Sequence, residues 1–508
     1  MVLNRERFES GLKSLGAIWE NEIPETDRLV DDTREIRRGD IYVLRQGAQP
    51  LSEAQAETFL RQAESAGAVG VIVDPEFRSI SISCVKILLP APHIHLGELA
   101  EAFYGNPSMS MKMIAVTGTN GKTTTTYLIE SLAKTMGLRV GVLGTVSYRY
   151  PGYEESSNNT TPGTLKLYRL LSEMNQAGCE LVAMEVSSHG IVQGRIDGVY
   201  FDVAIWNNLG TDHLDFHITR EAYARAKQRL FDHYLAESFR HGKKPVAIGN
   251  ADDDEVVSRL NSANPELWGG RVAFFSTHGV KNTTVQIRDF SWSNGLYHFD
   301  IVYKNSETAH SGLPLIGGYN LSNAAAAVTA LSMLGHDLSV MGEALSRIDQ
   351  IPGRMECVYS KGPAVIVDFA HTPEALENAL DAARSCVPAC GKLVVVFGAG
   401  GDRDPSKRPM MGRAAYQKAD KIYVTSDNPR TEDPKQIICQ ILAGMDDSTG
   451  VTDLVDRKEA IVRALDESNS NDIVLIAGKG HEDYQILGTT KIHFDDREIV
   501  REYYGITT

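Results

Sequence analysis

Met113-Ile-Ala-Val116, followed by Thr117-Gly-Thr-Asn-Gly-Lys-Thr-Thr-Thr125, is the stretch of sequence that decides the fold. An apolar run comes first, then a loop with two glycines, and then a helical pattern that ends at Gly137. Glycines let a backbone curl around phosphate oxygens, and a helix that starts at such a loop adds unpaired N–H groups. The order of strand, glycine loop, Lys-Thr and helix therefore predicts a phosphate-binding loop.

Two side chains of this loop are expected to contact a nucleotide directly. Lys122 would reach the outer phosphates, and the Thr123 hydroxyl would ligate Mg²⁺. Val116 occupies the place of the first glycine in the common form of the motif, so the loop is a shortened variant.

Outward from this loop, short β-rich runs alternate with helical patterns along nearly the whole chain, which is typical of α/β folds with largely parallel sheets. Pro-Gly and Gly-Asn-Pro turns separate three blocks. We expect three domains, an N-terminal α/β domain, a central mostly parallel domain like a P-loop ATPase, and a C-terminal Rossmann-like domain, over residues 1–97, 98–351 and 352–508. The segment 250–307 is polar and poor in strand patterns in places.

Length, composition and charge exclude several classes of protein. The 508 residues suggest about three domains at roughly 150 residues each. No apolar run approaches the length of a membrane helix, and the N-terminus lacks the apolar region of a secretory signal. The net charge of −15 disfavours a general nucleic-acid binder. We expect a cytoplasmic protein that does not insert into membranes, with its six cysteines reduced and not in a zinc site.

Two further strand ends carry candidate metal ligands. The apolar run 181–184 ends in Glu185, and the run 201–205 precedes a loop that contains His213. Because carboxyl ends of parallel strands share one edge of a sheet, both side chains are expected near the phosphate loop. Glu185 would supply a hard oxygen, and His213 a second ligand or a proton acceptor. Each alone is more typical of a helix cap or a surface residue, but their joint position favours a magnesium site.

Four strand ends in the last third of the chain carry polar loops. The loops begin at Asp368, Gly398, Asp427 and Gly478, and they contain cations and carboxylates together. Arginines suit bidentate recognition of carboxylates, and a glutamate suits an ammonium group. Arg403, Arg430 and Glu482 therefore indicate a site for a zwitterionic amino acid, although salt bridges would explain any one of these loops.

At this point the sequence resembles the Mur ligases, ATP-dependent enzymes that form amide bonds in peptidoglycan precursors. The motifs that carry the resemblance over nearly the whole chain are the phosphate loop, Glu185-Val-Ser-Ser-His189, Asp212-His-Leu-Asp215, Gly353-Arg354 and Asp368-Phe-Ala-His371. Asp427-Asn-Pro-Arg430 and Gly478-Lys-Gly-His-Glu-Asp483 are similar to the tripeptide-forming branch. Within it, Asp-Asn-Pro-Arg is typical of enzymes that add meso-2,6-diaminopimelate, because the arginine can bind the second carboxylate.

The resemblance implies roles for nucleotide and metal. ATP would be bound by Gly118, Thr119, Asn120, Gly121, Lys122, Thr123, Thr124, Asn320, Arg354 and Asp368. Lys227, on a predicted helix over 221–234, matches the lysine that CO₂ carbamylates in this family; from composition alone it would be a solvated charge. The resemblance thus implies Mg²⁺ held by Thr123, Glu185, His213 and carbamylated Lys227, with Lys122, Glu185, His213 and Lys227 as the catalytic residues.

The resemblance also implies the two other substrates. UDP-N-acetylmuramoyl-L-alanyl-D-glutamate would be bound by Thr33, Asn159, Thr160, Thr161, Ser187, Gln193 and Arg195. Diaminopimelate would be bound by Arg403, Asp427, Asn428, Pro429, Arg430, Gly478 and Glu482. The implied reaction passes through an acyl phosphate and releases ADP and phosphate, and we expect a monomer.

Three alternatives stay open at this point. The same ligase could use L-lysine, in which case Arg430 would be unimportant for the acceptor. A folylpolyglutamate synthetase shares the superfamily motifs but lacks a Gly-Lys-Gly-His-Glu-Asp loop of this kind. A nucleotide-gated binding protein without turnover is disfavoured by the presence of Lys122, Glu185, His213 and Lys227.

Overall fold

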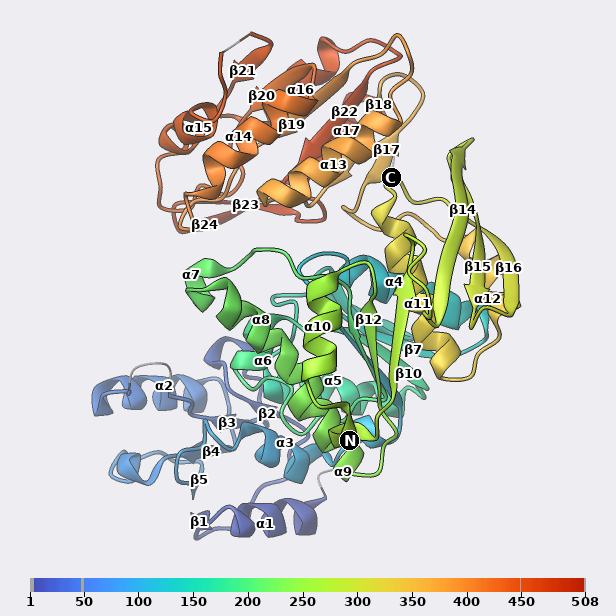
Figure 1. Cartoon of the computed structure of the whole chain (residues 1–508). Helices are drawn as coiled ribbons and strands as arrows, with labels where there is room; N and C mark the ends of the chain where they lie inside the picture. Colours follow the sequence, from blue (N-terminus) through green and yellow to red (C-terminus); the bar gives the residue numbers. More distant parts are fainter. Residues whose placement is uncertain (1–3, 47–49, 448, 507–508) are drawn as a thin grey trace.

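The computed structural model describes residues 4–46, 50–447 and 449–506. In the described part of the chain, three large β-sheets flanked by helices follow one another, with strands in residues 18–88, 112–313 and 356–477, and residues 484–493 form a small two-stranded sheet. In Figure 1 the C-terminal sheet lies at the top, the N-terminal sheet at the lower left, and the central sheet between them. The predicted three-part α/β architecture is confirmed, and the boundaries at 97/98 and 351/352 stay predictions.

The N-terminal layer contains a five-stranded sheet in the order β1-β5-β4-β3-β2. Only β1 is antiparallel to its neighbour, and the other pairs are parallel. A capping box at Ser52 begins the main surface helix, where Gln55 returns the hydrogen bond. The elements are α1 (Arg5–Ser14), β1 (Ile18–Trp19), β2 (Leu29–Val30), η1 (Thr33–Glu35), β3 (Ile41–Val43), α2 (Glu53–Ser65), β4 (Gly70–Val73), η2 (Pro75–Phe77), β5 (Val85–Leu88) and α3 (Leu96–Tyr104).

The first half of the central layer builds the parallel part of an 11-stranded sheet. The strand of the phosphate loop, β6, lies between β10 and β11 and is parallel to both. The elements are η3 (Pro107–Met109), β6 (Lys112–Thr117), α4 (Lys122–Thr135), β7 (Val140–Leu143), β8 (Ser147–Tyr150), β9 (Tyr153–Ser156), α5 (Thr164–Gln176), β10 (Leu181–Glu185), α6 (Ser188–Val192), β11 (Val203–Trp206), α7 (Leu214–His217) and α8 (Arg220–Arg229).

The predicted helix over 221–234 is present, but it changes from an α-helix to a π-helix along its length. It begins as α8 and continues as a π-helix, η4 (Leu230–Leu235), before α9 (Ala236–Arg240). Tyr234 in this turn donates to Asp197 Oδ1 over 2.7 Å. Such wide turns are common next to functional sites.

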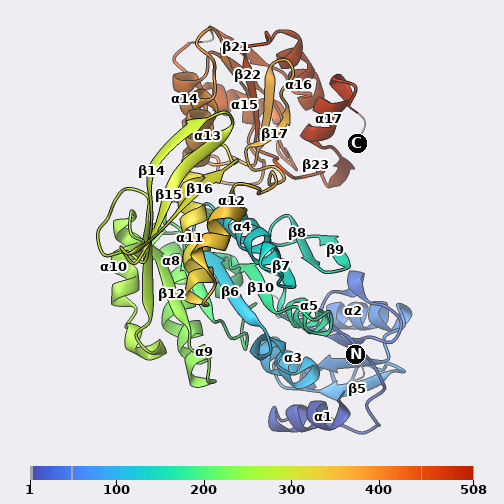
Figure 2. The same ribbon diagram turned by 90° about the vertical axis from the view of Figure 1, so that its right-hand side faces the viewer.

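The second half of the central layer corrects the prediction for 250–307. Where the sequence is polar, the structure contains three strands, and β14 and β15 form a long antiparallel hairpin with a bulge between Arg288 and Ser291. Figure 2 shows the hairpin rising beside the C-terminal layer. The elements are β12 (Val246–Asn250), α10 (Asp254–Ser262), η5 (Pro265–Trp268), β13 (Val272–Ser276), β14 (Val285–Ser293), β15 (Leu296–Tyr303), β16 (Glu307–Leu313), α11 (Tyr319–Met333) and α12 (Leu338–Leu345).

The C-terminal layer is a six-stranded sheet in the order β17-β18-β22-β19-β20-β21, parallel except for β17. Its parallel strands put the four polar loops at one edge. The elements are β17 (Glu356–Tyr359), β18 (Ala364–Asp368), α13 (Pro373–Ser385), β19 (Leu393–Phe397), α14 (Lys407–Lys418), β20 (Lys421–Val424), α15 (Pro434–Leu442), β21 (Val451–Asp453), α16 (Arg457–Asp466), β22 (Ile473–Ala477), β23 (Tyr484–Leu487), β24 (Thr490–His493) and α17 (Asp496–Tyr503).

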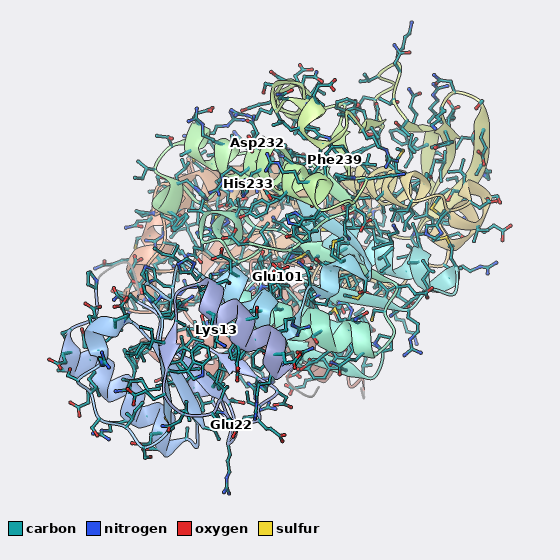
Figure 3. The ribbon with its side chains drawn as sticks, turned by 90° about the horizontal axis from the view of Figure 1, so that it is seen from below. Lys13, Glu22, Glu101, Asp232, His233 and Phe239 are labelled. Atoms are coloured by element: carbon teal, nitrogen blue, oxygen red, sulfur yellow. The ribbon has the colours of Figure 1, made fainter. Side chains whose placement is uncertain are left out.

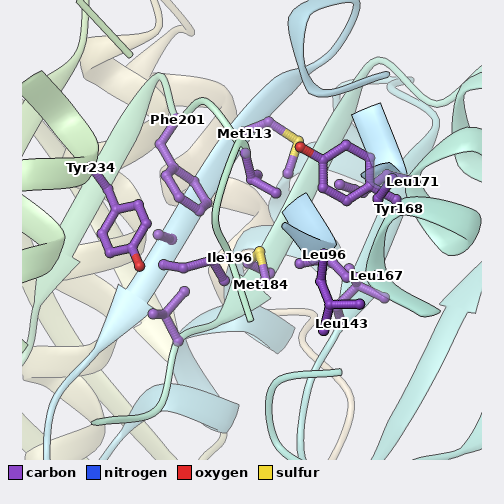
Figure 4. Packing of buried hydrophobic residues seen from close by; sticks show 14 of the residues in the cluster. Leu96, Met113, Leu143, Leu167, Tyr168, Leu171, Met184, Ile196, Phe201 and Tyr234 are labelled. Carbon is purple, nitrogen blue, oxygen red and sulfur yellow. The ribbon is translucent and has the colours of Figure 1, made fainter. Parts of the chain in front are cut away.

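One hydrophobic core joins the N-terminal and central layers. Phe8 of α1 meets Phe103 of α3 edge to face, with ring centroids 5.0 Å apart. Figure 4 shows Leu96 of α3 close to Leu167 and Tyr168 of α5, which belong to the same buried cluster. Burial of this apolar area is the main stabilising term, and it anchors the two layers to each other.

The lower end of the molecule lies away from the carboxyl edges of the parallel strands. In Figure 3, Lys13 and Glu22 mark the N-terminal layer, and Asp232, His233 and Phe239 mark the η4–α9 segment.

No helix in the described part of the chain has both the length and the apolar character needed to span a membrane.

A buried ion pair fixes the end of the C-terminal sheet. Arg457 and Asp496 have fully buried side chains and form two hydrogen bonds of 2.8 and 2.7 Å. Arg457 also donates to the carbonyls of Ser426 and Ala477, which lie next to the loops after β20 and β22. The pair therefore ties α16 and α17 to the two loops.

We expect Asp496→Ala to destabilise the protein strongly, because Arg457 would stay buried and charged without its partner. The loss of unfolding free energy should be about 3–5 kcal/mol, measured by urea denaturation. Glu502→Ala on the same helix is the control, because its pair with Lys458 is exposed and worth less than about 1 kcal/mol. Equal losses in the two variants would contradict this account.

Candidate active site

The phosphate loop joins β6 to α4 and has the predicted strand–loop–helix form. Gly118 and Gly121 have φ angles of 150° and 84°, which side-chain-bearing residues rarely adopt. A Cβ atom on Gly121 would collide with the Asn323 side chain of α11. Lys122 curls back and donates to the carbonyls of Gly118 and Thr119 over 2.9 and 3.0 Å.

The segment after β11 supports this loop from the side. Asn208 Oδ1 accepts from the Asn120 amide over 2.8 Å, and its amide group donates to the Asn120 carbonyl. Thr119 Oγ1 accepts from Gly210 over 2.9 Å. Thr124 is buried in the first turn of α4. Asn208 was absent from the predicted site, although its place at a strand end adjoining the loop could have indicated it.

Lys227 reaches the same loop from α8. Its side chain is buried, and its Nζ donates to the Gly118 carbonyl over 2.9 Å. The Tyr223 ring lies 4.5 Å from this Nζ. Burial, together with the positive charge of Lys122, holds the pKa of Lys227 well below its ordinary value. The shift increases the fraction of the neutral amine, which is the form that reacts with CO₂.

Glu185 and His213 occupy the strand-end positions that the sequence predicts. Glu185 lies at the end of β10 in register with Val116, and its two oxygens accept from the amide and hydroxyl of Thr145 over 2.8 and 2.9 Å. His213 has a φ of 55°, and burial lowers its pKa to about 4 despite the neighbouring Asp212. Near neutral pH this imidazole is unprotonated and can act as a ligand or proton acceptor.

Arg354 brings the C-terminal layer to the phosphate loop. One of its Nη atoms donates to Thr123 Oγ1 over 3.0 Å, and its guanidinium lies 4.6 Å from the centre of the Phe369 ring. Its Nε, like the buried Thr117 Oγ1, has no hydrogen-bond partner in the described part of the chain. Unpaired buried donors next to a phosphate loop fit a bound polyphosphate.

Asp368 and Asn320 lie on either side of this junction. Asp368 accepts from the Met355 amide over 2.8 Å, and burial raises its pKa. Asn320, at the start of α11, donates to the Ile316 carbonyl over 2.8 Å and accepts from Asn323. Both side chains are buried.

Most of the residues predicted for the UDP-linked substrate form one hydrogen-bonded cluster. Thr161 Oγ1 donates to the Glu185 carbonyl and accepts from the Ser187 amide, both over 3.0 Å. Arg195 donates to the Thr161 carbonyl over 2.7 Å and to Gln193 over 2.9 Å.

The remaining predicted contacts lie at the edge of this cluster. Thr160 Oγ1 is 3.1 Å from Thr145 Oγ1, and the Asn159 carbonyl accepts from the Tyr148 hydroxyl. Thr33 lies in η1 of the N-terminal layer, and no hydrogen bond in the described ranges joins it to Thr161. The structure thus gathers six of the seven predicted residues around Thr161, and Thr33 belongs to the neighbouring N-terminal layer, whose Asp31 and Arg45 act on Arg195.

The loops after β20 and β22 meet at the predicted amino-acid pocket. Asn428 donates to Glu482 Oε2 over 2.9 Å, and Gly478 approaches Asp427 so closely that a Cβ there would lie 2.5 Å from the carboxylate. Arg430 has a φ of 52° and donates to the Gly401 carbonyl over 2.7 Å.

Backbone packing fixes the remaining members of this pocket. A Cβ on Gly401 would collide with the Pro429 carbonyl. Arg403 is exposed, and its one hydrogen bond to a described residue goes to the Asp402 carbonyl over 3.1 Å. Two guanidinium groups and two carboxylates therefore border one site.

Arg408 holds two of these loops together, and sequence reasoning missed it. Its fully buried guanidinium forms paired bonds of 2.8 and 2.9 Å with Glu432 and also donates to the Gly400 carbonyl. Lys407 and Arg408 begin α14, although the positive end of a helix dipole disfavours cations. Two adjacent cations in the first turn of a helix are unusual, and this pattern in the sequence indicates that Lys407 and Arg408 have a specific role.

A phosphate loop on a mostly parallel sheet, facing a second α/β layer, defines a P-loop nucleotide-binding protein. Family models match in two places: residues 116–331 match the Mur ligase middle domain, and residues 353–480 match the Mur ligase glutamate ligase domain. The chain belongs to the Mur ligase family.

Relatives with similarity over almost their whole length share one name, UDP-N-acetylmuramoyl-L-alanyl-D-glutamate–2,6-diaminopimelate ligase. The protein from Gloeobacter violaceus is 41% identical, with 93% of each chain covered. The protein from Geobacillus thermodenitrificans is 38% identical, with 94% of each covered. A solved structure with this name has a TM-score of 0.63 at 32% identity, covering 96% of this chain and 97% of the other. The MurF ligase from Thermotoga maritima in complex with ADP has a TM-score of 0.66 at 21% identity, covering 90% and 94%, and shares the fold.

We expect Gly121→Ala to abolish ATP binding, because the added methyl would collide with Asn323 and deform the loop. Isothermal titration with ATP measures the effect. Gly137→Ala is the matched control, because Gly137 has a similar φ of 80° but nothing within 4 Å of the added atom. Unchanged affinity in Gly121→Ala, or equal losses in both variants, would contradict the assignment of the loop.

Proposed function

We propose that this protein is an ATP-dependent ligase that joins meso-2,6-diaminopimelate to UDP-N-acetylmuramoyl-L-alanyl-D-glutamate. The reaction forms an amide bond and releases ADP and phosphate, and the product is a precursor of peptidoglycan. The observation that carries the proposal is the pocket in which Asn428 is bonded to Glu482 and Arg430 is held at Gly401. It offers a carboxylate for an ammonium group and a separate guanidinium for a distant carboxylate.

The proposed ATP site lies between the phosphate loop and Arg354. Lys122 and Arg354 would contact the phosphates, and the loop amides at the start of α4 would add hydrogen bonds and partial positive charge. Asn320 would face the adenine, and Asp368 the ribose. The remaining proposed contacts are Gly118, Thr119, Asn120, Gly121, Thr123 and Thr124.

The residues at the loop fit Mg²⁺. Oxygen and imidazole donors are present: a hydroxyl on Thr123, the buried carboxylate of Glu185 and the neutral ring of His213. A carbamate on Lys227 would add a second anionic ligand in place of an ammonium group. When bound, Mg²⁺ would neutralise charge on the ATP phosphates.

The UDP-linked substrate is proposed to lie along the Thr161 cluster. Arg195 is suited to bind an anionic group there. The charges of Arg45 and Asp31, in the N-terminal layer, also act on the pKa of Arg195. The other proposed contacts are Thr33, Asn159, Thr160, Ser187 and Gln193.

Arg430 favours diaminopimelate over L-lysine as the acceptor. Lysine lacks the second carboxylate that a guanidinium at this position would bind. Arg403 is proposed to bind carboxylate as well, and Asp427 and Glu482 the ammonium group. Asn428, Pro429 and Gly478 would shape the pocket.

The proposed reaction has two steps on one carboxyl group. The glutamyl carboxylate attacks the γ-phosphorus of ATP, and ADP leaves. The amine of diaminopimelate then attacks the acyl carbon, the C–N bond forms, and phosphate departs with the electron pair of the broken C–O bond. Lys122 would hold the phosphates throughout, and the proton that the amine loses would pass to His213 or to a carboxylate.

The substrates are small molecules, and we propose that the protein works as a cytoplasmic monomer without nucleic acid. The net charge of −15 disfavours binding to nucleic acid. The three domains are proposed to span 1–97, 98–351 and 352–508.

The proposal is tested by phosphate release with ATP, Mg²⁺ and UDP-N-acetylmuramoyl-L-alanyl-D-glutamate, with either amino acid as the acceptor. Release with diaminopimelate alone supports it. A preference for L-lysine would keep the ligase and overturn the acceptor, and no release with either would overturn the function.

We expect Arg430→Ala to raise KM for diaminopimelate about 10- to 100-fold, the equivalent of a charged hydrogen bond of about 1.5–3 kcal/mol. Any slow use of L-lysine should change little. Steady-state kinetics measure both, and Arg413→Ala on exposed α14 surface is the control. An unchanged KM for diaminopimelate would remove Arg430 from acceptor recognition.

We expect Lys227→Ala to abolish amide formation, because the carbamate could not form. Formate or acetate should restore part of the activity by occupying the same space with a carboxylate. Arg225→Ala, on the exposed side of α8, serves as the control and should stay active without additive. Near-normal activity of Lys227→Ala without added carboxylate would exclude the carbamate.

A further inference from the structure

Lys407 lies in the first turn of α14, where the helix dipole makes a cation unfavourable by about 0.3–1 kcal/mol. The adjacent Arg408 compensates through its bonds to Glu432 and Gly400. Within the described ranges, Lys407 has no partner comparable to Glu432, and its one hydrogen bond goes to the His371 carbonyl over 3.0 Å. Lys407 is partly buried, and its ammonium group forms no ion pair with a carboxylate among the described residues.

The surroundings of Lys407 place it between two sites. Burial lowers its pKa, and the carboxylates of Asp212, Asp427 and Asp404 act against this effect. Asp212 belongs to the central layer and also faces Lys122 of the phosphate loop. Asp427 belongs to the amino-acid pocket, next to Gly478. A carboxylate of the central layer and one of the amino-acid pocket therefore both act on the Lys407 ammonium group.

Contacts between the layers bring this region together. The Glu374 carboxylate at the start of α13 lies against Gly210, and its pKa is raised by burial and by the charge of Asp253 and lowered by that of Arg220. His371, whose carbonyl binds Lys407, also faces Asp212 and Asp427. The ammonium group thus points toward the junction of the central and C-terminal layers.

An ammonium group has three N–H donors, and only one of those on Lys407 has a partner within the described residues. We propose that the other two bind the oxygens of the phosphorylated glutamyl carboxyl group, so that Lys407 is a catalytic residue of the amide-forming step. The inference rests on the proposed function.

In that step the amine lone pair forms the C–N bond while the C–O bond to phosphorus breaks. The electron pair leaves with phosphate, and the amine loses one proton. Negative charge grows on the acyl oxygen and on the departing phosphate, and Lys407 stays protonated and stabilises that charge. Removing such a donor typically costs about 10²–10³-fold in rate.

The test uses hydroxylamine, a small amine that traps an acyl phosphate as a hydroxamate without needing the amino-acid pocket. The full-length Lys407→Gln variant is incubated with ATP, Mg²⁺ and UDP-N-acetylmuramoyl-L-alanyl-D-glutamate, and hydroxamate is measured. Kinetics with diaminopimelate follow separately. Lys418→Gln, at the other end of α14 in a surface pair with Asp381, is the matched control.

We expect Lys407→Gln to lower both hydroxamate formation and kcat at least tenfold, with KM for diaminopimelate within about twofold of the unaltered protein. Lys407→Arg should restore part of kcat because it keeps the charge, and thermal melting would show that each variant is folded. If KM rises while hydroxamate formation is unchanged, Lys407 binds the amino acid and the proposal is overturned. Normal values for both overturn it as well. Absence of hydroxamate with the unaltered protein would instead contradict the proposed function.

Discussion

The carbonyl oxygen of Gly118 is the point on which the site depends. Two lysines from different helices, Lys122 and Lys227, both donate to it. Burial disfavours the charge on each, and the charge of Lys122 disfavours that of Lys227 further. A polyphosphate, or a carbamate on the second lysine, would turn this repulsion into attraction.

The proposed site lies where the central and C-terminal sheets present their carboxyl edges to each other. Arg354 crosses from the C-terminal layer to Thr123, while the pocket around Asn428 and Glu482 stays on its own sheet. Each layer therefore contributes only part of the proposed site. The parallel arrangement of strands explains why both parts appear at one junction, since such sheets bind ligands at that edge.

The sequence predicted the elements whose patterns are local. The phosphate loop, the strand ends at Glu185 and the four loops of the last third needed only apolar runs and glycines. The strands within 250–307 were missed because their polar faces point to solvent, and the π-helix after Arg229 leaves no periodic signal. Arg408 was missed because its structural role depends on an ion pair with Glu432, a residue distant in the sequence.

Arg430 is held by its backbone as well as by its side chain. Its amide and carbonyl bond to Ile486 and Gly488, so that the residue is paired with the outer ribbon of β23 and β24. The ribbon turns at Gly488, where φ is 62°. In the proposed acceptor pocket, mutations in this peripheral ribbon would change amino-acid preference by shifting Arg430, while the residues of the phosphate loop stayed the same.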